Sequence, residues 1–281
     1  MTISDLQSNF IEKLEGLYTK GEAERLFFIG LEDLMDINLS QYRVEQNRTT
    51  KEIDPKRMLN YLQGLLEGKP YQHLIGEVHF ANLKLRVGSE ALIPRPETEE
   101  LAYLIKEKND TAAQLSILDI GTGTGCLALA CAHFFKNSKV EAVDISKEAL
   151  GLARANTKQN SLDVKFWEAD ILDKSKWPSG NWDLIVSNPP YIGESEAVEM
   201  DDLVKEHEPH TALFVPDNDL LIFYRAIMEL ANERLNIGGK VYLEINQKLG
   251  EATRELFVNE GYETRLLKDL SGNDRFVVAE R

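Results

Sequence analysis

The stretch ILDIGTGTG, from Ile117 to Gly125, joins a short apolar run to three glycines spaced two residues apart. The apolar run predicts a strand buried on both faces, and the glycines predict a sharp turn into a following helix. Backbone N–H groups at such a helix start can approach a ligand closely, because no side chain stands in the way. The turn alone leaves two interpretations open, a nucleotide-like ligand or only a tight strand-to-helix connection.

The segments around this turn alternate between predicted strands and predicted helices. Strands are expected at 115–120, 139–145, 163–170, 182–188, 239–245, 262–267 and 275–280, with helices at 97–109, 124–136, 147–160, 218–236 and 247–260. The early strands are continuous apolar runs, as expected where helices cover both faces of a parallel sheet. The alternation predicts an α/β fold with a Rossmann-like, seven-stranded, doubly wound sheet.

The chain before this α/β region has a different pattern. Residues 1–70 place apolar side chains at intervals of three and four, which predicts a bundle of three to five helices. In one of these helices Asp54 is the expected N-cap, Pro55 the first helical residue, and the end lies near Gly68. Residues 71–95 contain EVHFANLKLRV, an alternating pattern around the turn AN that predicts a β-hairpin linker. The division is therefore 1–70 helical, 71–95 hairpin linker and 96–281 α/β.

Charge and composition restrict the class of protein. The 281 residues carry a net charge of −15, of which −3 falls on residues 1–90 and −12 on residues 91–281. An acidic α/β region argues against a nucleic-acid substrate, because it repels a phosphate backbone. The mean hydropathy of −0.32 and the lack of a long apolar stretch predict a protein with no membrane partner. The acidic N-terminus does not have the pattern of a signal peptide, and Cys126 and Cys131 are expected to be small buried hydrophobic residues, so a cytoplasmic location is expected.

Acidic residues follow the predicted strands next to the glycine turn. Asp144 ends the second strand, about 20 residues after the glycines, where a carboxylate can accept hydrogen bonds from ribose hydroxyls. Asp170 ends the third strand at the same edge. Either residue alone could instead be a helix cap or a turn residue. Asp119, before the glycines, could face the positive end of a cofactor or could orient the turn.

The fourth strand ends in SNPPYI, from Ser187 to Ile192. Two prolines cannot continue a parallel strand, so the chain turns abruptly after Asn188. The Asn188 side-chain carbonyl and the Pro189 backbone carbonyl could accept the two N–H groups of a planar NH2 group and direct its nitrogen toward a methyl donor. The alternative is a turn with no chemical role. At this strand end the catalytic interpretation is favoured, with Pro190 as a rigid support and Tyr191 as an aromatic face.

This arrangement resembles the class I methyltransferases that use S-adenosyl-L-methionine. The similarity extends to the segments YQHLIGEVHF (71–80), LIPRPETEEL (92–101), AVDIS (142–146), EHEPHTAL (206–213), YLEINQ (242–247) and SGNDRFVVAER (271–281). Over about residues 55–281 the sequence resembles the HemK/PrmC family, the protein-(glutamine-N5) methyltransferases of peptide-chain release factors. The motif NPPY alone is shared with methyltransferases that act on DNA and RNA, whereas PRPETE combined with it is more specific.

The resemblance implies a substrate, a cofactor and roles for the residues. The substrate is the glutamine of the Gly-Gly-Gln tripeptide in class 1 release factors, gripped by a helical substrate-recognition domain and the catalytic domain. S-adenosyl-L-methionine is the methyl donor and S-adenosyl-L-homocysteine the product. The cofactor-binding residues implied are Gly121, Thr122, Gly123, Thr124, Gly125, Asp144, Asp170 and Asn188. The catalytic and substrate-binding residues implied are Asn188, Pro189, Pro190 and Tyr191, while the segment Arg95–Glu99 closes over the cofactor. Ile171 stands where the family has an aromatic residue, so only an apolar contact with adenine is expected there.

Two alternatives to this function remain. A nucleic-acid amino methyltransferase, acting on adenine N6, cytosine N4 or guanine N2, fits NPPY equally well but requires a basic surface. A binding module that keeps the cofactor pocket but has lost catalysis is not supported, since Asn188 and Tyr191 are both present. A metal site formed by Glu206, His207, Glu208 and His210 is not expected, because Pro209 interrupts the helical spacing and the reaction needs no metal.

Overall fold

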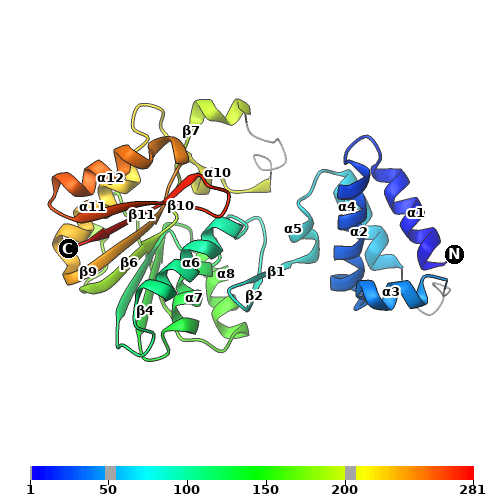
Figure 1. Ribbon diagram of the computed structural model, residues 1–281, viewed down its shortest axis with the longest axis horizontal. Helices are drawn as coiled ribbons and strands as arrows, with labels where there is room; N and C mark the ends of the chain where they lie inside the picture. Colours follow the sequence, from blue (N-terminus) through cyan, green and yellow to red (C-terminus); the bar gives the residue numbers. More distant parts are fainter. Residues whose placement is uncertain (1, 48–54, 200–206) are drawn as a thin grey trace. The chain divides into compact units, whose positions relative to one another are not determined.

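The strands predicted between residues 115 and 280 pair into one seven-stranded sheet in the computed structural model, which describes residues 2–47, 55–199 and 207–281 (Figure 1). In spatial order they are β10 (Glu263–Lys268), β11 (Asp274–Glu280), β9 (Leu235–Glu244), β6 (Trp182–Ser187), β3 (Ser116–Ile120), β4 (Lys139–Asp144) and β5 (Lys165–Glu168). Within this sheet β11 pairs antiparallel with both of its neighbours, and the other pairs are parallel. The strand order reverses between β3 and β6, and doubly wound sheets bind ligands at such a switch point. The predicted Rossmann-like fold is confirmed.

Helices cover both faces of this sheet. On one face α6 (Pro96–Lys108) and α7 (Cys126–Phe134) share a buried apolar cluster with the inner strands, and on the other α11 (Ile222–Arg234) and α12 (Gly250–Asn259) share a second cluster. Helix α8 (Lys147–Gln159) packs on β4 and β5. The predicted helices are all present, with ends shifted by up to four residues. Strand β5 ends at Glu168, so Asp170 lies in the connection after it.

The predicted hairpin forms from β1 (Glu77–Phe80) and β2 (Leu83–Arg86). Its turn residues Ala81 and Asn82 have φ angles of +50° and +62°, as in the two-residue turns that suit strand twist. The fully buried Asn156 of α8 accepts a hydrogen bond from the Arg86 N–H at 2.7 Å and donates to the Thr124 carbonyl at 2.9 Å. The hairpin is therefore anchored to the same helix that lies behind the glycine turn.

The chain divides into two compact units, Met1–Glu77 and Val78–Arg281. The described part of the first unit contains five helices: α1 (Ile3–Leu14), α2 (Lys20–Met35), α3 (Leu39–Glu45), α4 (Lys56–Leu66) and α5 (Tyr71–Ile75). Capping boxes begin the first three, where Thr2, Thr19 and Asn38 each exchange hydrogen bonds with the residue three positions later. Asp54, the predicted cap of α4, lies outside the described residues, and Pro55 directly precedes that helix.

The core of the first unit follows the three-and-four spacing of its sequence. On α1 the buried positions are Ile3, Leu6, Phe10 and Leu14. Phe10 meets Phe27 of α2 edge-on, with ring centroids 5.5 Å apart. These contacts give the helical unit a hydrophobic core of its own, separate from the two clusters that flank the sheet.

Short elements complete the described chain. They are the 3-10 helices η2 (Lys174–Lys176), η3 (Glu194–Glu199) and η4 (Gln247–Leu249), the helix α10 (His210–Leu213), and the paired strands β7 (Ile192–Gly193) and β8 (Phe214–Val215). The helices in residues 2–47, 55–199 and 207–281 are all too short or too polar to cross a membrane.

Gly125 is the glycine on which the packing of α7 against α8 depends. It precedes α7 with a φ of +85°, a left-handed conformation that glycine adopts without strain. A Cβ at this position would lie 2.9 Å from Leu129 Cδ1 and 3.2 Å from Ala153 Cβ. Backbone conformation and helix contact therefore both exclude a side chain here.

Gly125→Ala is expected to destabilise the second unit by about 3 kcal/mol, through left-handed strain and overpacking together. Gly261→Ala is the matched control, because Gly261 has a φ of +87° and a Cβ there would meet nothing within 4 Å. It should cost about 1 kcal/mol. Urea denaturation followed by tryptophan fluorescence measures both, since all three tryptophans lie in the second unit. Equal losses for the two variants would contradict the packing role of Gly125.

Candidate active site

A cavity of about 340 Å³ opens at the carboxyl ends of β3, β4 and β6, at the switch point of the sheet. The predicted residues that line it are Gly121, Thr122, Gly123, Thr124, Asp144, Asp170, Asn188, Pro189 and Pro190. Ile93, Pro94, Arg95 and Thr98 line another part of its wall. Two predicted residues, Gly125 and Tyr191, do not line the cavity.

The glycine turn is held against β4 by its own backbone. Gly121 and Gly123 have φ angles of +71° and +54°. The N–H groups of Gly121 and Thr122 donate to the Val143 carbonyl at 2.9 and 3.0 Å. A Cβ on Gly121 would meet nothing within 4 Å, so glycine keeps this part of the wall open.

Asp144 lies where the sequence predicted it, at the end of β4. One carboxyl oxygen accepts from the Gly123 N–H at 2.8 Å and the other from the Ser146 N–H at 2.9 Å. Burial raises the pKa of Asp144, and these backbone donors oppose that rise. The carboxylate thus connects the glycine turn to the start of α8 while it faces the cavity.

Asp119 is the most completely buried carboxyl group of the cavity wall, with 1% of its surface exposed. Its Oδ2 accepts from the Thr122 hydroxyl at 2.6 Å and the Ala128 N–H at 3.1 Å. Its Oδ1 is buried, and the described residues provide it with no hydrogen-bond partner. Burial raises the pKa of Asp119 to about 7, against the two donors and with a further rise from Asp144. Both proposed roles of Asp119 remain compatible with this geometry, since one oxygen orients the turn and the other is left for a cation.

Asp170 and Ile171 form the wall after β5. Asp170 Oδ1 accepts from the Leu172 N–H at 2.9 Å, the local turn expected of an aspartate after a strand. Ile171 is 8% exposed and lines the cavity, and its carbonyl accepts from the Trp177 indole N–H at 2.8 Å. An apolar side chain therefore stands at this wall, next to an acidic one.

The segment containing PRPETE is joined to the segment containing EHEPH. Glu208, which is 6% exposed, forms an ion pair with Arg95 and accepts from the Ile93 N–H at 2.8 Å. Burial raises the pKa of Glu208, and Arg95 opposes that rise. Glu208 thus holds this part of the cavity wall in place. Glu206, which belongs to the same EHEPH segment, lies outside the described residues.

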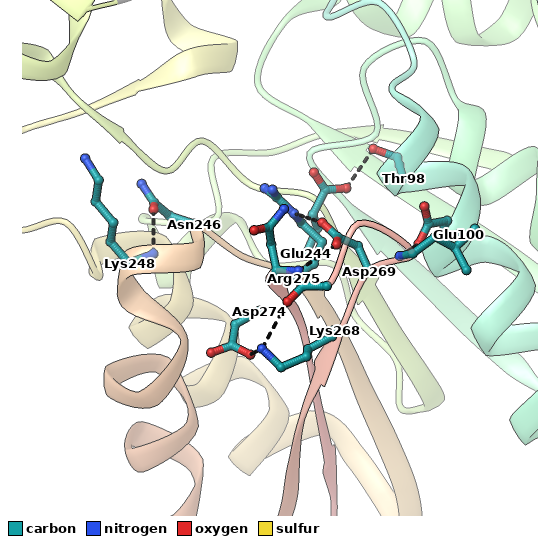
Figure 2. A network of polar contacts seen from close by, with 12 residues as sticks. Thr98, Glu100, Glu244, Asn246, Lys248, Lys268, Asp269, Asp274 and Arg275 are labelled. Carbon is teal, nitrogen blue, oxygen red and sulfur yellow. Dashed lines mark hydrogen bonds and ion pairs between the residues drawn. The ribbon is translucent and has the colours of Figure 1, made fainter.

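Asn188 follows β6 directly and has a defined side-chain partner. Its Nδ2 donates to the Thr98 hydroxyl oxygen at 3.0 Å, and the Thr98 hydroxyl donates to Glu244 Oε2 at 2.7 Å. Tyr191 turns its hydroxyl toward the same carboxylate and donates to Glu244 Oε1 at 3.3 Å. Figure 2 shows the Thr98–Glu244 bond within a larger polar network at the ends of β9 and β11.

Glu244 was not assigned a role from the sequence. It stands between Leu243 and Ile245, near the carboxyl end of a predicted strand that is otherwise mainly apolar after Lys240. That single acidic residue at a carboxyl strand end was the available signal. It parallels Asp144, which the same reasoning did identify.

Comparison with known proteins agrees with the fold. Residues 80–207 match the model of the Methyltransferase small domain. A methyltransferase of Pyrococcus furiosus has a similar fold, with a TM-score of 0.52, 23% identity, and 80% of this chain and 98% of that one covered. A T. thermophilus 16S rRNA methyltransferase in complex with AdoMet and guanosine gives a TM-score of 0.51 at 19% identity, covering 73% and 49%. The fold is that of a class I methyltransferase.

The sequence relatives identify the family. The release factor glutamine methyltransferase of Flavobacterium psychrophilum is 40% identical over 99% of this chain and 98% of its own length. That of Streptococcus pneumoniae is also 40% identical, over 100% and 99%. The chain belongs to the release factor glutamine methyltransferase family, as the sequence motifs predicted.

Asp119 makes the stability of the protein depend on pH. Its folded pKa of about 7 exceeds the usual value of 3.8, so between these pH values the unfolded chain releases a proton that the folded chain retains. Stability therefore falls as pH rises through this window. Asp119→Asn removes this pH dependence. The free energy of unfolding of the variant, relative to that of the parent protein, should therefore rise by on the order of 2 kcal/mol from about pH 5 to about pH 8.

Urea denaturation of both proteins at the two pH values provides this measurement. Asp163→Asn, which neutralises an exposed carboxylate, is the control for the change in net charge. The difference in unfolding free energy between that control and the parent protein should be the same at both pH values. If the difference between Asp119→Asn and the parent protein were also the same at both pH values, a raised pKa of Asp119 would be excluded.

Proposed function

We propose that this protein transfers a methyl group from S-adenosyl-L-methionine to the side-chain amide nitrogen, N5, of the glutamine in the Gly-Gly-Gln motif of class 1 release factors. The observation that carries the proposal is Asn188, a polar amide fixed at the cavity wall where β6 stops. The relatives named for release factor glutamine support it, because they match the chain over nearly its whole length.

The residues that line the cavity suit this cofactor. S-adenosyl-L-methionine supplies a methyl group made electrophilic by the sulfonium to which it is bonded, and is left as S-adenosyl-L-homocysteine. Asp119 offers an unpartnered buried carboxylate oxygen to its positive charge. Gly121 leaves room for close approach, and Asp144 is the candidate partner of the ribose hydroxyls. Asp170 and Ile171 are the candidate contacts of the adenine end.

Asn188 and Pro189 would hold the substrate amide. An amide nitrogen is a poor nucleophile because its lone pair is delocalised into the carbonyl, and no base of ordinary strength removes its proton. Two fixed acceptors, Asn188 Oδ1 and the Pro189 carbonyl, can orient the NH2 group and stabilise the positive charge that develops on it during transfer. Pro189 and Pro190 keep those acceptors rigid. The ring of Tyr191 is the candidate aromatic face beside them.

The helical unit is the candidate domain for recognising the release factor. It has its own core and its own helix caps, so it is a folded unit distinct from the catalytic domain. A release factor works in translation, so we expect this enzyme in the cytoplasm. The acidic charge of residues 91–281 favours a protein over a nucleic acid as substrate.

Incubation of the purified protein with release factor and S-adenosyl-L-methionine, followed by mass spectrometry of the tryptic peptides, tests this function. The Gly-Gly-Gln peptide should gain the mass of one methyl group. A release factor with asparagine in place of that glutamine is the control and should gain none. Methyl transfer to RNA or DNA, with no gain on the peptide, would support the nucleic-acid alternative instead.

Asn188→Ala is expected to lower kcat by about 10², because one preorganised acceptor is worth roughly 2–4 kcal/mol in the transition state. The dissociation constant of S-adenosyl-L-methionine should change less than about threefold. Single-turnover methylation and isothermal titration calorimetry give the two quantities separately. A large increase in the dissociation constant of S-adenosyl-L-methionine would show that Asn188 acts mainly in cofactor binding and not in positioning the substrate.

Asp144→Ala should show the reverse pattern. The variant loses the candidate ribose partner and the bond that holds the Gly123 N–H at 2.8 Å, so cofactor affinity should fall by about tenfold or more. At saturating cofactor, kcat should remain within about threefold of the parent value. Calorimetry and steady-state kinetics measure both, and unchanged affinity would rule out the assigned role.

A further inference from the structure

Glu244 is a buried carboxylate directly behind the candidate amide-binding residues. It is the last residue of β9, which pairs with β6 so that Leu243 lies opposite Ser187. Glu244 is 1% exposed and does not line the cavity. Glu244 contacts Tyr191 directly and is linked to Asn188 through the Thr98 hydroxyl.

The contacts form a short chain. Glu244 Oε2 accepts from the Thr98 hydroxyl at 2.7 Å, and the Thr98 oxygen accepts from Asn188 Nδ2 at 3.0 Å. Glu244 Oε1 accepts from the Tyr191 hydroxyl at 3.3 Å. Thr98 comes from the first turn of α6, so these hydrogen bonds join one helix to the ends of two neighbouring strands. Figure 2 shows the Thr98–Glu244 bond.

The chemistry of these groups fixes which group donates and which accepts in each of these hydrogen bonds. An ionised carboxylate can only accept hydrogen bonds, so the single hydroxyl hydrogen of Thr98 must point to Glu244. The Thr98 oxygen is then left only as an acceptor, and the group of Asn188 that faces it must be the NH2. The planar Asn188 amide is thereby held in one of its two orientations.

We propose that Glu244 and Thr98 are positioning residues that hold the Asn188 amide with its NH2 against Thr98 and its Oδ1 available to the substrate. This inference rests on the proposed function, in which Oδ1 accepts from the glutamine amide. If the Asn188 amide were reversed, its NH2 would face the NH2 of the substrate, two donors with no acceptor between them. Tyr191 is held by the other oxygen of the same carboxylate.

The charge on Glu244 is set by the groups around it. Burial raises the pKa of Glu244 to about 7, the Thr98 and Tyr191 donors and the Arg275 guanidinium lower it, and Glu97 raises it. Arg275 itself forms an ion pair with Asp269 at 3.2 Å (Figure 2), and the Tyr224 hydroxyl contacts the Glu244 carbonyl at 3.4 Å. Assays at about pH 8 therefore keep Glu244 mainly ionised, and an ionised carboxylate only accepts hydrogen bonds.

A pair of substitutions at Thr98 tests the inference. Thr98→Val keeps the shape of the side chain but removes the hydroxyl, and should lower kcat on the release factor by about tenfold or more. Thr98→Ser restores the hydroxyl and should return kcat to within about threefold of the parent. The dissociation constant of S-adenosyl-L-methionine, from calorimetry, should change less than about threefold in both. Glu244→Gln, whose NH2 can donate to Thr98 and allow the Asn188 amide to reverse, should lower kcat by a similar factor.

The decisive measurement is the double variant. In the Asn188→Ala background, Thr98→Val should cause no further loss of kcat, because its effect acts through Asn188. Tyr242→Phe is the matched control: it removes the bond from Asn109 Nδ2 to the Tyr242 hydroxyl at 2.9 Å, which also joins the end of α6 to β9, and should leave kcat unchanged.

The outcomes separate the two proposals. A parent protein that does not methylate the Gly-Gly-Gln peptide overturns the proposed function. A parent that methylates it overturns only the positioning inference if Thr98→Val retains full kcat, if Thr98→Ser fails to rescue, or if the losses of Thr98→Val and Asn188→Ala simply multiply. Urea denaturation of each variant identifies any that do not fold, and the Thr98→Val and Thr98→Ser pair remains informative if Glu244→Gln is one of them.

Discussion

The site depends on the parallel register that ends three strands at one edge of the sheet. Ile120, the last residue of β3, pairs with Val143 of β4 and with Ser187 of β6, and the Ser187 hydroxyl also donates to the Ile120 carbonyl at 2.7 Å. The glycine turn, Asp144 and Asn188 therefore emerge side by side. A slip of one residue in β6 would move Asn188 by about 3.3 Å along the strand, beyond the reach of its hydrogen bond to Thr98.

The same edge concentrates buried carboxyl groups in a way that stability alone does not explain. Burial raises the pKa of Asp119, Asp144 and Glu244, so each is less stable as an anion in the fold than in water. For Asp144 and Glu244, hydrogen-bond donors to both carboxyl oxygens offset the cost of burying the charge. Asp119 has one oxygen without a partner among the described residues. Under the proposed function, that difference leaves Asp119 with an oxygen available to a cationic ligand.

The sequence predicted those parts of the site that are local in the chain. Gly121 to Gly125, Asp144 and Asn188 each follow a recognisable strand, so their common edge could be inferred from the strand alternation. The bond between Thr98 and Glu244 joins residues 146 positions apart, and no periodicity brings such a pair together. Tyr191 was expected at the substrate, yet its hydroxyl direction depends on Glu244 and could not be known before β9 was placed.

The chemistry of an amide substrate explains why so much structure supports one asparagine. A base could activate an amine or a hydroxyl over a range of positions, but a neutral amide nitrogen must be aligned, because little else can raise its reactivity. Alignment by an asparagine has a weakness, since its side-chain amide presents an acceptor in one orientation and a donor in the other. A neutral partner at Thr98 alone could tolerate both orientations. A carboxylate beyond Thr98 removes that freedom, because it accepts only, and this gives Glu244 a reason to be buried where an apolar residue would be more stable.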